Sequence, residues 1–175
     1  LRAETLRDCL LAVSGRLDSA LEGYTGPADQ GGGGGPPNHR RGIYQYIKRE
    51  AQDHMMLMFD APEGARTVGL RESTSVPGQA LLLLNNEFVH RQAVAWARRS
   101  LADERGLARD LRIERLFRQA IGREPEVAEA EALSLFFERQ ADAYRLDTTA
   151  RAADERPWAD LCHVLFNTKE FLYVR

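Results

Sequence analysis

The sequence predicts a mainly α protein: a single helical domain over residues 1–175 with one small extended or two-stranded β element. Apolar residues recur at three- and four-residue steps in several separate segments, as they do on amphipathic helices. Residues that commonly begin or end helices stand between those segments. A length of 175 residues is enough for one domain to close a core without disulfides or metals.

The first predicted helix spans residues 3–22 and ends at Gly23. Residues 26–39 contain a five-glycine run beside Pro36 and Pro37, and this composition predicts a flexible insertion. A phosphate-binding glycine loop would need a helix start and a Lys-Ser or Lys-Thr pair where the prolines stand. The inner stripe of the helix is Leu6, Leu10, Val13, Leu17 and Leu21.

The small β element is predicted at residues 43–48, where β-tolerant side chains alternate after Gly42. A second short strand at residues 67–73 could pair with it. Between them, residues 55–59 hold three methionines, and such a cluster favours adaptable core packing over metal binding. Asp60 then begins a turn.

The stretch LLLLNNEF, residues 81–88, predicts a corner between two helices. Pro77 suits the first turn of the first helix, and Asn85 can end it. Asn86 is a favoured N-cap of the second helix, and Glu87 then lies at the positive end of its dipole.

A second corner of the same kind is predicted near the C-terminus, where Asn167 ends one helix and Thr168 caps residues 170–172. Further helices are predicted at residues 113–121, at residues 130–144 and from Pro157 onward. The mixed-sign residues 98–115 predict solvated helix surface.

Composition argues against a polyanion partner, because 24 basic and 26 acidic residues give a net charge of −2. No stretch approaches the roughly 18 apolar residues of a membrane helix. The chain begins at Leu1 already close to a helical pattern, so we expect the C-terminal fragment of a longer protein. Cys9 and Cys162 form no zinc or CxxC motif, and they could form a disulfide only if their helices touch.

Several arginines surround the extended segment and the turn, interleaved with Tyr44 and Tyr46. A single-strand nucleic-acid platform also mixes basic and aromatic residues, but it would normally carry a positive balance. Pairing with Asp60, Glu50 or Glu72 is therefore the better interpretation. The arginines are Arg40, Arg41, Arg49, Arg66 and Arg71.

Two carboxylate–histidine pairs carry the sharpest chemical hypothesis: Glu87-x-x-His90 and Asp160-x-x-His163. In helical di-metal proteins, two Glu-x-x-His pairs converge with further carboxylates. Against a metal site, Glu87 already suits a helix start, Asp160 is short, and Arg91 flanks His90. We therefore assign no metal ligand and no cofactor, and the catalytic residues stay unknown.

Six sequence blocks occur in order along the chain: residues 3–18 (AETLRDCLLAVSGRLD), 40–49 (RRGIYQYIKR), 59–64 (FDAPEG), 71–89 (RESTSVPGQALLLLNNEFV), 117–125 (FRQAIGREP) and 158–174 (WADLCHVLFNTKEFLYV). Together they resemble the planctomycete-specific C-terminal domain of unknown function. The resemblance implies large exported proteins in which a cytochrome c-like haem segment or carbohydrate-binding modules lie elsewhere, and it carries over no catalytic residue. The glycine run and Gly78 depart from the family pattern.

Together these observations favour a non-catalytic scaffold or interaction domain. The resemblance alone implies that it belongs to a multidomain exported bacterial protein, in the periplasm, at the cell surface or secreted. Its partners would be upstream domains of the same chain, with a haem redox module among them. The alternative is part of an enzyme, metal-dependent or acting on polysaccharide, whose site is shared with an upstream domain. An enzyme predicts a deep pocket gathering Asp60, Arg71, His90 or His163, whereas a scaffold predicts these groups paired or open to water.

Overall fold

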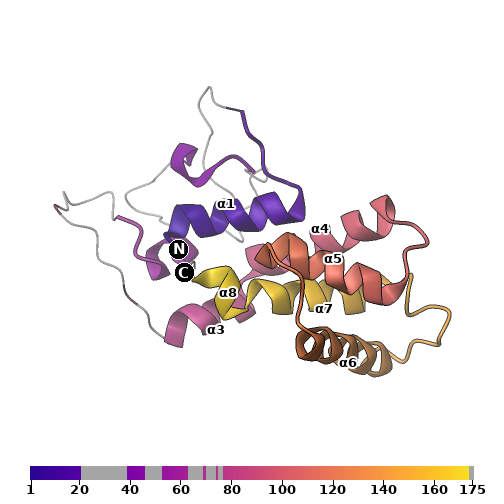
Figure 1. Ribbon diagram of the computed structural model, residues 1–175. Helices are drawn as coiled ribbons and strands as arrows, with labels where there is room; N and C mark the ends of the chain where they lie inside the picture. The colour runs from indigo at the N-terminus through magenta and orange to yellow at the C-terminus, as the bar shows by residue number, and fades with distance from the viewer. Residues whose placement is uncertain (21–38, 46–52, 63–68, 70–73, 75–76, 174–175) are drawn as a thin grey trace.

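The computed structural model describes residues 1–20, 39–45, 53–62, 69, 74 and 77–173. Within them the chain is mainly α, as predicted, and the only β feature is an isolated parallel bridge between Asp18 and Arg40 (Figure 1). The elements are α1 (Ala3–Ser14), the 3-10 helix η1 (Gly42–Tyr44), α2 (His54–Met58), α3 (Pro77–Asn85), α4 (Glu87–Asp103), α5 (Arg109–Ile121), α6 (Val127–Ala143), α7 (Glu155–Phe166) and α8 (Lys169–Leu172).

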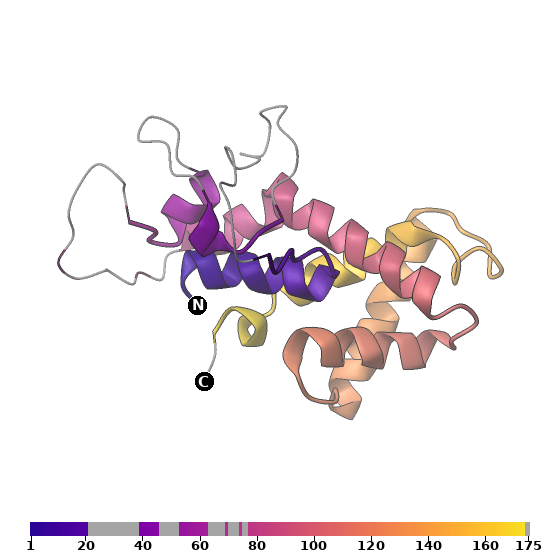
Figure 2. The same ribbon diagram turned by 90° about the horizontal axis from the view of Figure 1, so that it is seen from above.

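The helices pack around a central pair, α4 and α7. The first helix, α1, lies against α4, while α5 and α6 pack on each other and on α7 (Figures 1 and 2). The N-terminus contacts α8, since the Leu1 amino group donates to the Leu172 carbonyl over 3.0 Å. No described helix is long and apolar enough to cross a membrane.

Buried aromatic rings join these helices into one core. Trp96 of α4 lies 5.1 Å from Phe166 of α7, centroid to centroid, and Phe137 of α6 lies 4.2 Å from Trp158 of α7. Burying rings of this size removes the most apolar area per residue from water. The core is therefore centred on α7, which contributes to both ring pairs.

Among the residues that the structure describes, the predicted β element is not seen. Ile43 and Tyr44 belong to η1, because the Asp8 carboxylate accepts from the Gly42 amide over 2.6 Å and draws the chain onto α1. At Gly42 a Cβ atom would meet Glu4 Cα at 2.9 Å, so the approach requires glycine. Residues 46–52 and nearly all of 67–73 lie outside the described residues.

The first helix is shorter than predicted, ending at Ser14. Gly15 has a left-handed φ of 75°, and the amides of Gly15 and Arg16 donate back to the Ala12 and Leu11 carbonyls. A glycine C-cap of this kind ends a helix even where apolar spacing continues. Leu17 therefore lies beyond the helix. Residues 26–38 of the predicted insertion lie outside the described residues.

Both asparagine corners are confirmed. The Asn86 side chain caps α4 by accepting from the Phe88 and Val89 amides at 2.8 and 3.3 Å. Thr168 caps α8 in the same way through the Phe171 amide. At each corner the preceding asparagine donates to the carbonyl four residues earlier: Asn85 to Leu81 and Asn167 to His163, both over 2.8 Å.

The remaining helices also lie where the apolar stripes predicted them. Gly122, with φ 84°, ends α5. Helix α6 begins with a capping box between Glu126 and Glu129. Helix α7 begins at Glu155, slightly before Pro157, because the Asp154 side chain caps it through the Arg156 amide.

Residues 98–115 are mostly solvated surface, but Arg112 is an exception. It is only 4% exposed, and its guanidinium donates to the Ser100 carbonyl and, over 2.6 Å, to the Glu104 carbonyl. It also lies 5.4 Å from the Trp158 ring centroid. Each of these carbonyls also accepts from one backbone amide, of Glu104 and Leu107 respectively. Arg112 therefore adds a second donor to both carbonyls and holds the end of α4 against α5 and α7.

Candidate functional site

Packing of α4 on α7 brings His90 and His163 together. Their ring centroids are 5.9 Å apart, with the ring planes at 75°. His90 is exposed on α4, and His163 is half-buried on α7. The structure thus joins the two imidazoles that the metal hypothesis requires.

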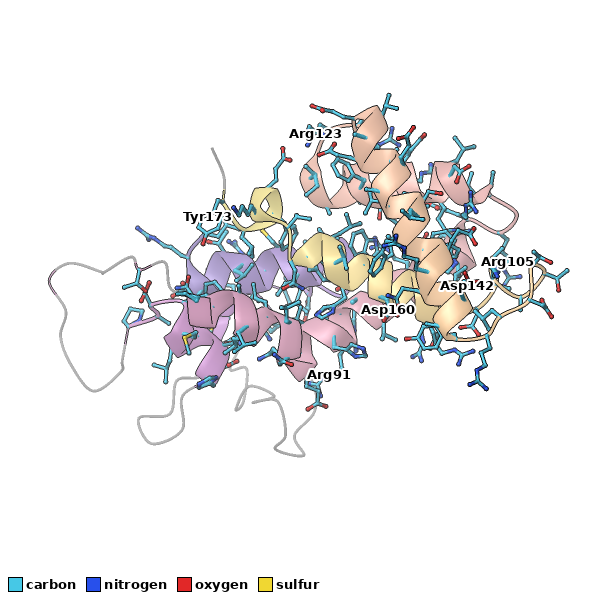
Figure 3. The ribbon with its side chains drawn as sticks, turned by 90° about the horizontal axis from the view of Figure 1, so that it is seen from below. Arg91, Arg105, Arg123, Asp142, Asp160 and Tyr173 are labelled. Carbon is cyan, nitrogen blue, oxygen red and sulfur yellow. The ribbon has the colours of Figure 1, made fainter. Side chains whose placement is uncertain are left out.

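The carboxylates of the same motifs are held by other partners. Glu87 pairs with Arg91 on the next turn of α4 over 3.2 Å, and Asp160 accepts from the Tyr144 hydroxyl over 2.8 Å. Figure 3 shows Asp160 beside α6 and Arg91 at the outer edge of α4. Across the part of the chain that the structure describes, no three His, Cys, Asp or Glu side chains are placed to hold a metal ion.

His163 also ties α7 to the first corner, because its Nε2 lies 3.2 Å from the Leu83 carbonyl oxygen. A carbonyl can only accept, so this hydrogen bond requires the proton on Nε2. The remaining nitrogen, Nδ1, is then the atom able to accept a proton or bind a metal. Metal-binding histidines commonly make such a bond through their other nitrogen.

Tyr144 and Asp160 form a structural rather than an acid–base pair. Burial raises the pKa of the Tyr144 phenol, and its hydrogen bond to Asp160 raises it further. The phenol therefore stays protonated near neutral pH and donates to the carboxylate. Arg156 lies over the Tyr144 ring, 4.8 Å from its centroid.

The other candidates do not join the histidine pair. Asp60 accepts from the Thr74 amide over 2.6 Å and from its hydroxyl, and Arg71 lies outside the described residues. A partly open pocket of about 220 Å³ lies between α5 and α6, and neither Asp60 nor either histidine lines it.

The arginines near the N-terminal segments make local contacts. Arg41 pairs with Asp8 over 3.2 Å, a partner that we did not predict. Arg40 donates to the Ala20 carbonyl over 2.8 Å and lies over the Tyr44 ring. Arg49, Arg66 and Arg71 lie outside the described residues.

Both cysteines are free thiols. Cys162 is fully buried, and burial raises its pKa well above the ordinary value. Burial also raises the pKa of the half-buried Cys9 thiol, with a further contribution from Asp8. Both thiols therefore stay neutral near pH 7, which disfavours a nucleophilic role.

The sequence did not lead us to predict two arginine contacts: that of Arg112, described above, and that of Arg123, which lies in the turn before α6. Its guanidinium pairs with Glu129 and Glu170, each over 2.7 Å, and lies over the Phe117 ring. Figure 3 shows it at the start of α6. The sequence did contain a signal that Arg112 is buried, because it lies one turn before Leu116, beside the apolar stripe of α5.

These features define a helical domain in which Glu87, Asp160 and His163 each contact another group of the same chain. A family model, PSD1, described as a protein of unknown function (DUF1553), matches residues 1–137. The chain therefore belongs to this family, as the resemblance to a domain of unknown function suggested. The matched segment covers α1 to α5 and the first part of α6. No curated protein and no solved structure matches the chain.

Proposed function

We propose that this chain is a non-catalytic scaffold or interaction domain of a multidomain exported bacterial protein, with a haem redox module among its candidate partners. The observation that supports this function is the pairing of Glu87, Asp160 and His163 with Arg91, Tyr144 and the Leu83 carbonyl. A reaction centre needs such groups to converge on one space, whereas satisfied groups fix the shape of a framework.

Long-range ion pairs support the same function. Arg98 of α4 holds Glu155 at the start of α7 through two hydrogen bonds of 2.6 and 2.9 Å. Arg123 joins the start of α6 to Glu170 of α8. Paired arginine–carboxylate contacts of this type fix geometry as well as adding energy, and a rigid framework loses less entropy when a partner binds.

The direct test is binding between this chain and the preceding region of its parent protein, each produced separately. Isothermal titration calorimetry is expected to show a saturable complex, and the fluorescence of the two buried tryptophans, Trp96 and Trp158, serves as the control for integrity of the fold. Heat-free titrations at concentrations up to the millimolar range would contradict the proposal. Catalytic turnover by the isolated chain would contradict the non-catalytic part of the proposal.

One observation favours the second candidate, a half-site of a metal-dependent enzyme: the 5.9 Å approach of His90 and His163. Metal analysis of the purified chain, alone and joined to the preceding region, separates the two functions. The scaffold predicts far less than one metal per chain in both samples. Stoichiometric metal that is lost in both His90→Ala and His163→Ala, but retained in a His54→Ala control, would establish the enzyme alternative.

A further inference from the structure

On the face formed by α5 and α6, acidic side chains surround an open pocket. The pocket has a volume of about 220 Å³ and mostly apolar walls, with Ile113 and Ala130 among its lining residues. Asp110 and Glu114 reach it from successive turns of α5, and Glu131 reaches it from α6. Figure 3 shows Arg123 and Asp142 at opposite ends of α6. The residues of α6 that line the pocket, Ala130, Glu131 and Ser134, lie between these two positions in the sequence.

Two of these carboxylates have no partner within the described residues. Asp110 pairs with Arg109 over 2.9 Å, but no described side chain forms a hydrogen bond or ion pair with Glu114 or Glu131. Elsewhere on α6, Glu129 and Glu138 are both paired with arginines. The pocket therefore carries uncompensated negative charge, which attracts a cation.

Large apolar side chains are exposed beside the pocket. Val127 is 77% exposed and lies one turn before Glu131 on α6, and Leu135 is 52% exposed and lies one turn after it. Leu111, 53% exposed, neighbours Asp110 on α5. Exposed apolar side chains next to charged groups are typical of protein interaction sites.

The size of the pocket decides the class of occupant. Small-molecule sites usually measure about 300–1,000 Å³ and enclose most of their ligand, so this pocket is too small and too open for one. It suits a single long side chain with an apolar stem and a positive end. Arginine and lysine have this form, and their stems pack against apolar walls while the charge stays near solvent.

We propose that the α5–α6 face docks a partner polypeptide by an arginine or lysine that enters this pocket, flanked by apolar residues that cover Leu111, Val127 and Leu135. The inference deepens the proposed interaction function and rests on it. The guanidinium or ammonium group pairs with Glu114 and Glu131, and the aliphatic stem contacts Ile113 and Ala130.

The experiment is an NMR titration of the isotope-labelled chain with a short amphipathic peptide carrying one central arginine between leucines. The matched probe has citrulline, a neutral isostere, in place of arginine. We expect shifts confined to α5 and α6, and affinity about fivefold tighter for the arginine peptide, as for exposed ion pairs. Added salt is expected to reduce that difference.

The Glu114→Gln/Glu131→Gln double variant keeps the shape of both side chains and is expected to bind the two peptides equally. Asp103→Asn removes one exposed carboxylate at the end of α4 and is the control, with the preference retained. Equal binding of both peptides by the unsubstituted chain, or shifts outside α5 and α6, would overturn the proposal. If the chain still binds its parent region in that case, the interaction function stands and only this pocket is wrong.

Discussion

The α4–α7 interface and the α5–α6 face differ in whether their polar side chains have partners within the described residues. At the interface, Asp160 accepts from Tyr144, His163 contacts the Leu83 carbonyl, and two tryptophans are buried. On the α5–α6 face, Glu114 and Glu131 surround a pocket without any described partner. The contrast indicates that the first region maintains the fold and the second is available for recognition.

The largest effect is expected from Trp96→Ala at the interface. Trp96 is fully buried, and its indole N–H donates to Gln119 over 2.7 Å. The cavity should lower the free energy of unfolding by about 3–5 kcal/mol, measured by urea denaturation. If that variant fails to fold, Phe166→Leu, with an expected loss of about 1–2 kcal/mol, tests the same contact. A loss below about 1 kcal/mol for Trp96→Ala would contradict this packing.

Arg112→Met is expected to lower the free energy of unfolding by about 2–3 kcal/mol, because it removes charge-assisted hydrogen bonds to the Ser100 and Glu104 carbonyls, which keep only their backbone donors. Arg112→Lys should recover little of the lost stability, since a single ammonium cannot reproduce the planar guanidinium group. Thermal and urea unfolding of both variants provide the measurement. A fully restored stability with lysine would show that charge alone matters there.

Asn86→Ala is expected to cost about 1 kcal/mol, through loss of the cap on the Phe88 and Val89 amides. Asn86→Asp keeps an accepting oxygen and should retain most of the stability. The difference between the two variants in urea midpoint is the readout. Equal midpoints would mean that the corner does not depend on the side-chain cap.

Glu129 gives a pH dependence at the end of the α5–α6 face. Its hydrogen bond with Arg123, aided by the Glu126 amide, lowers its pKa from 4.5 to about 2. A carboxyl group with a depressed folded pKa contributes stability above about pH 4.5 and loses it as the pH falls toward 2. The stability difference between the unsubstituted chain and Glu129→Gln should shrink over that window. A difference that is constant from pH 6 to 2.5 would be inconsistent with the ion pair.

The smallest effect on stability is expected from Glu114→Gln and Glu131→Gln, whose carboxylates have no described partner to lose. Each should change the free energy of unfolding by less than about 0.5 kcal/mol. The same urea titration measures it, with Glu129→Gln as the paired comparison. A larger loss would mean that these carboxylates stabilise the fold, and the contrast between the two regions would fail.

Local signals explain which helices the sequence predicted well. Caps such as Asn86 and stops such as Gly122 act within one turn, so neighbouring residues suffice to predict them. The early end of α1 at Gly15 was missed because Leu17 continues the apolar spacing. There, Arg99 of α4 donates to the Val13 carbonyl over 2.8 Å, and this distant contact lies beside the cap.

The candidate site also combines features that local spacing predicts with contacts that it does not predict. Spacing alone placed each histidine one turn after a carboxylate, but their meeting depends on how α4 packs against α7. The partner of Asp160, Tyr144, comes from the end of the preceding helix, and the partner of Arg112 comes from the end of α4. Such contacts join residues from separate helices, so no local sequence pattern predicts them.

The most direct test of the account is carboxyl footprinting by mass spectrometry, in which exposed Asp and Glu side chains are coupled to an amine. The isolated chain is compared with the intact parent protein. We predict that labelling of Glu114 and Glu131 falls in the intact protein while Asp103 is unchanged. Unchanged labelling of both glutamates, with new protection at Glu87 and Asp160 instead, would contradict the account and direct attention to the histidine pair.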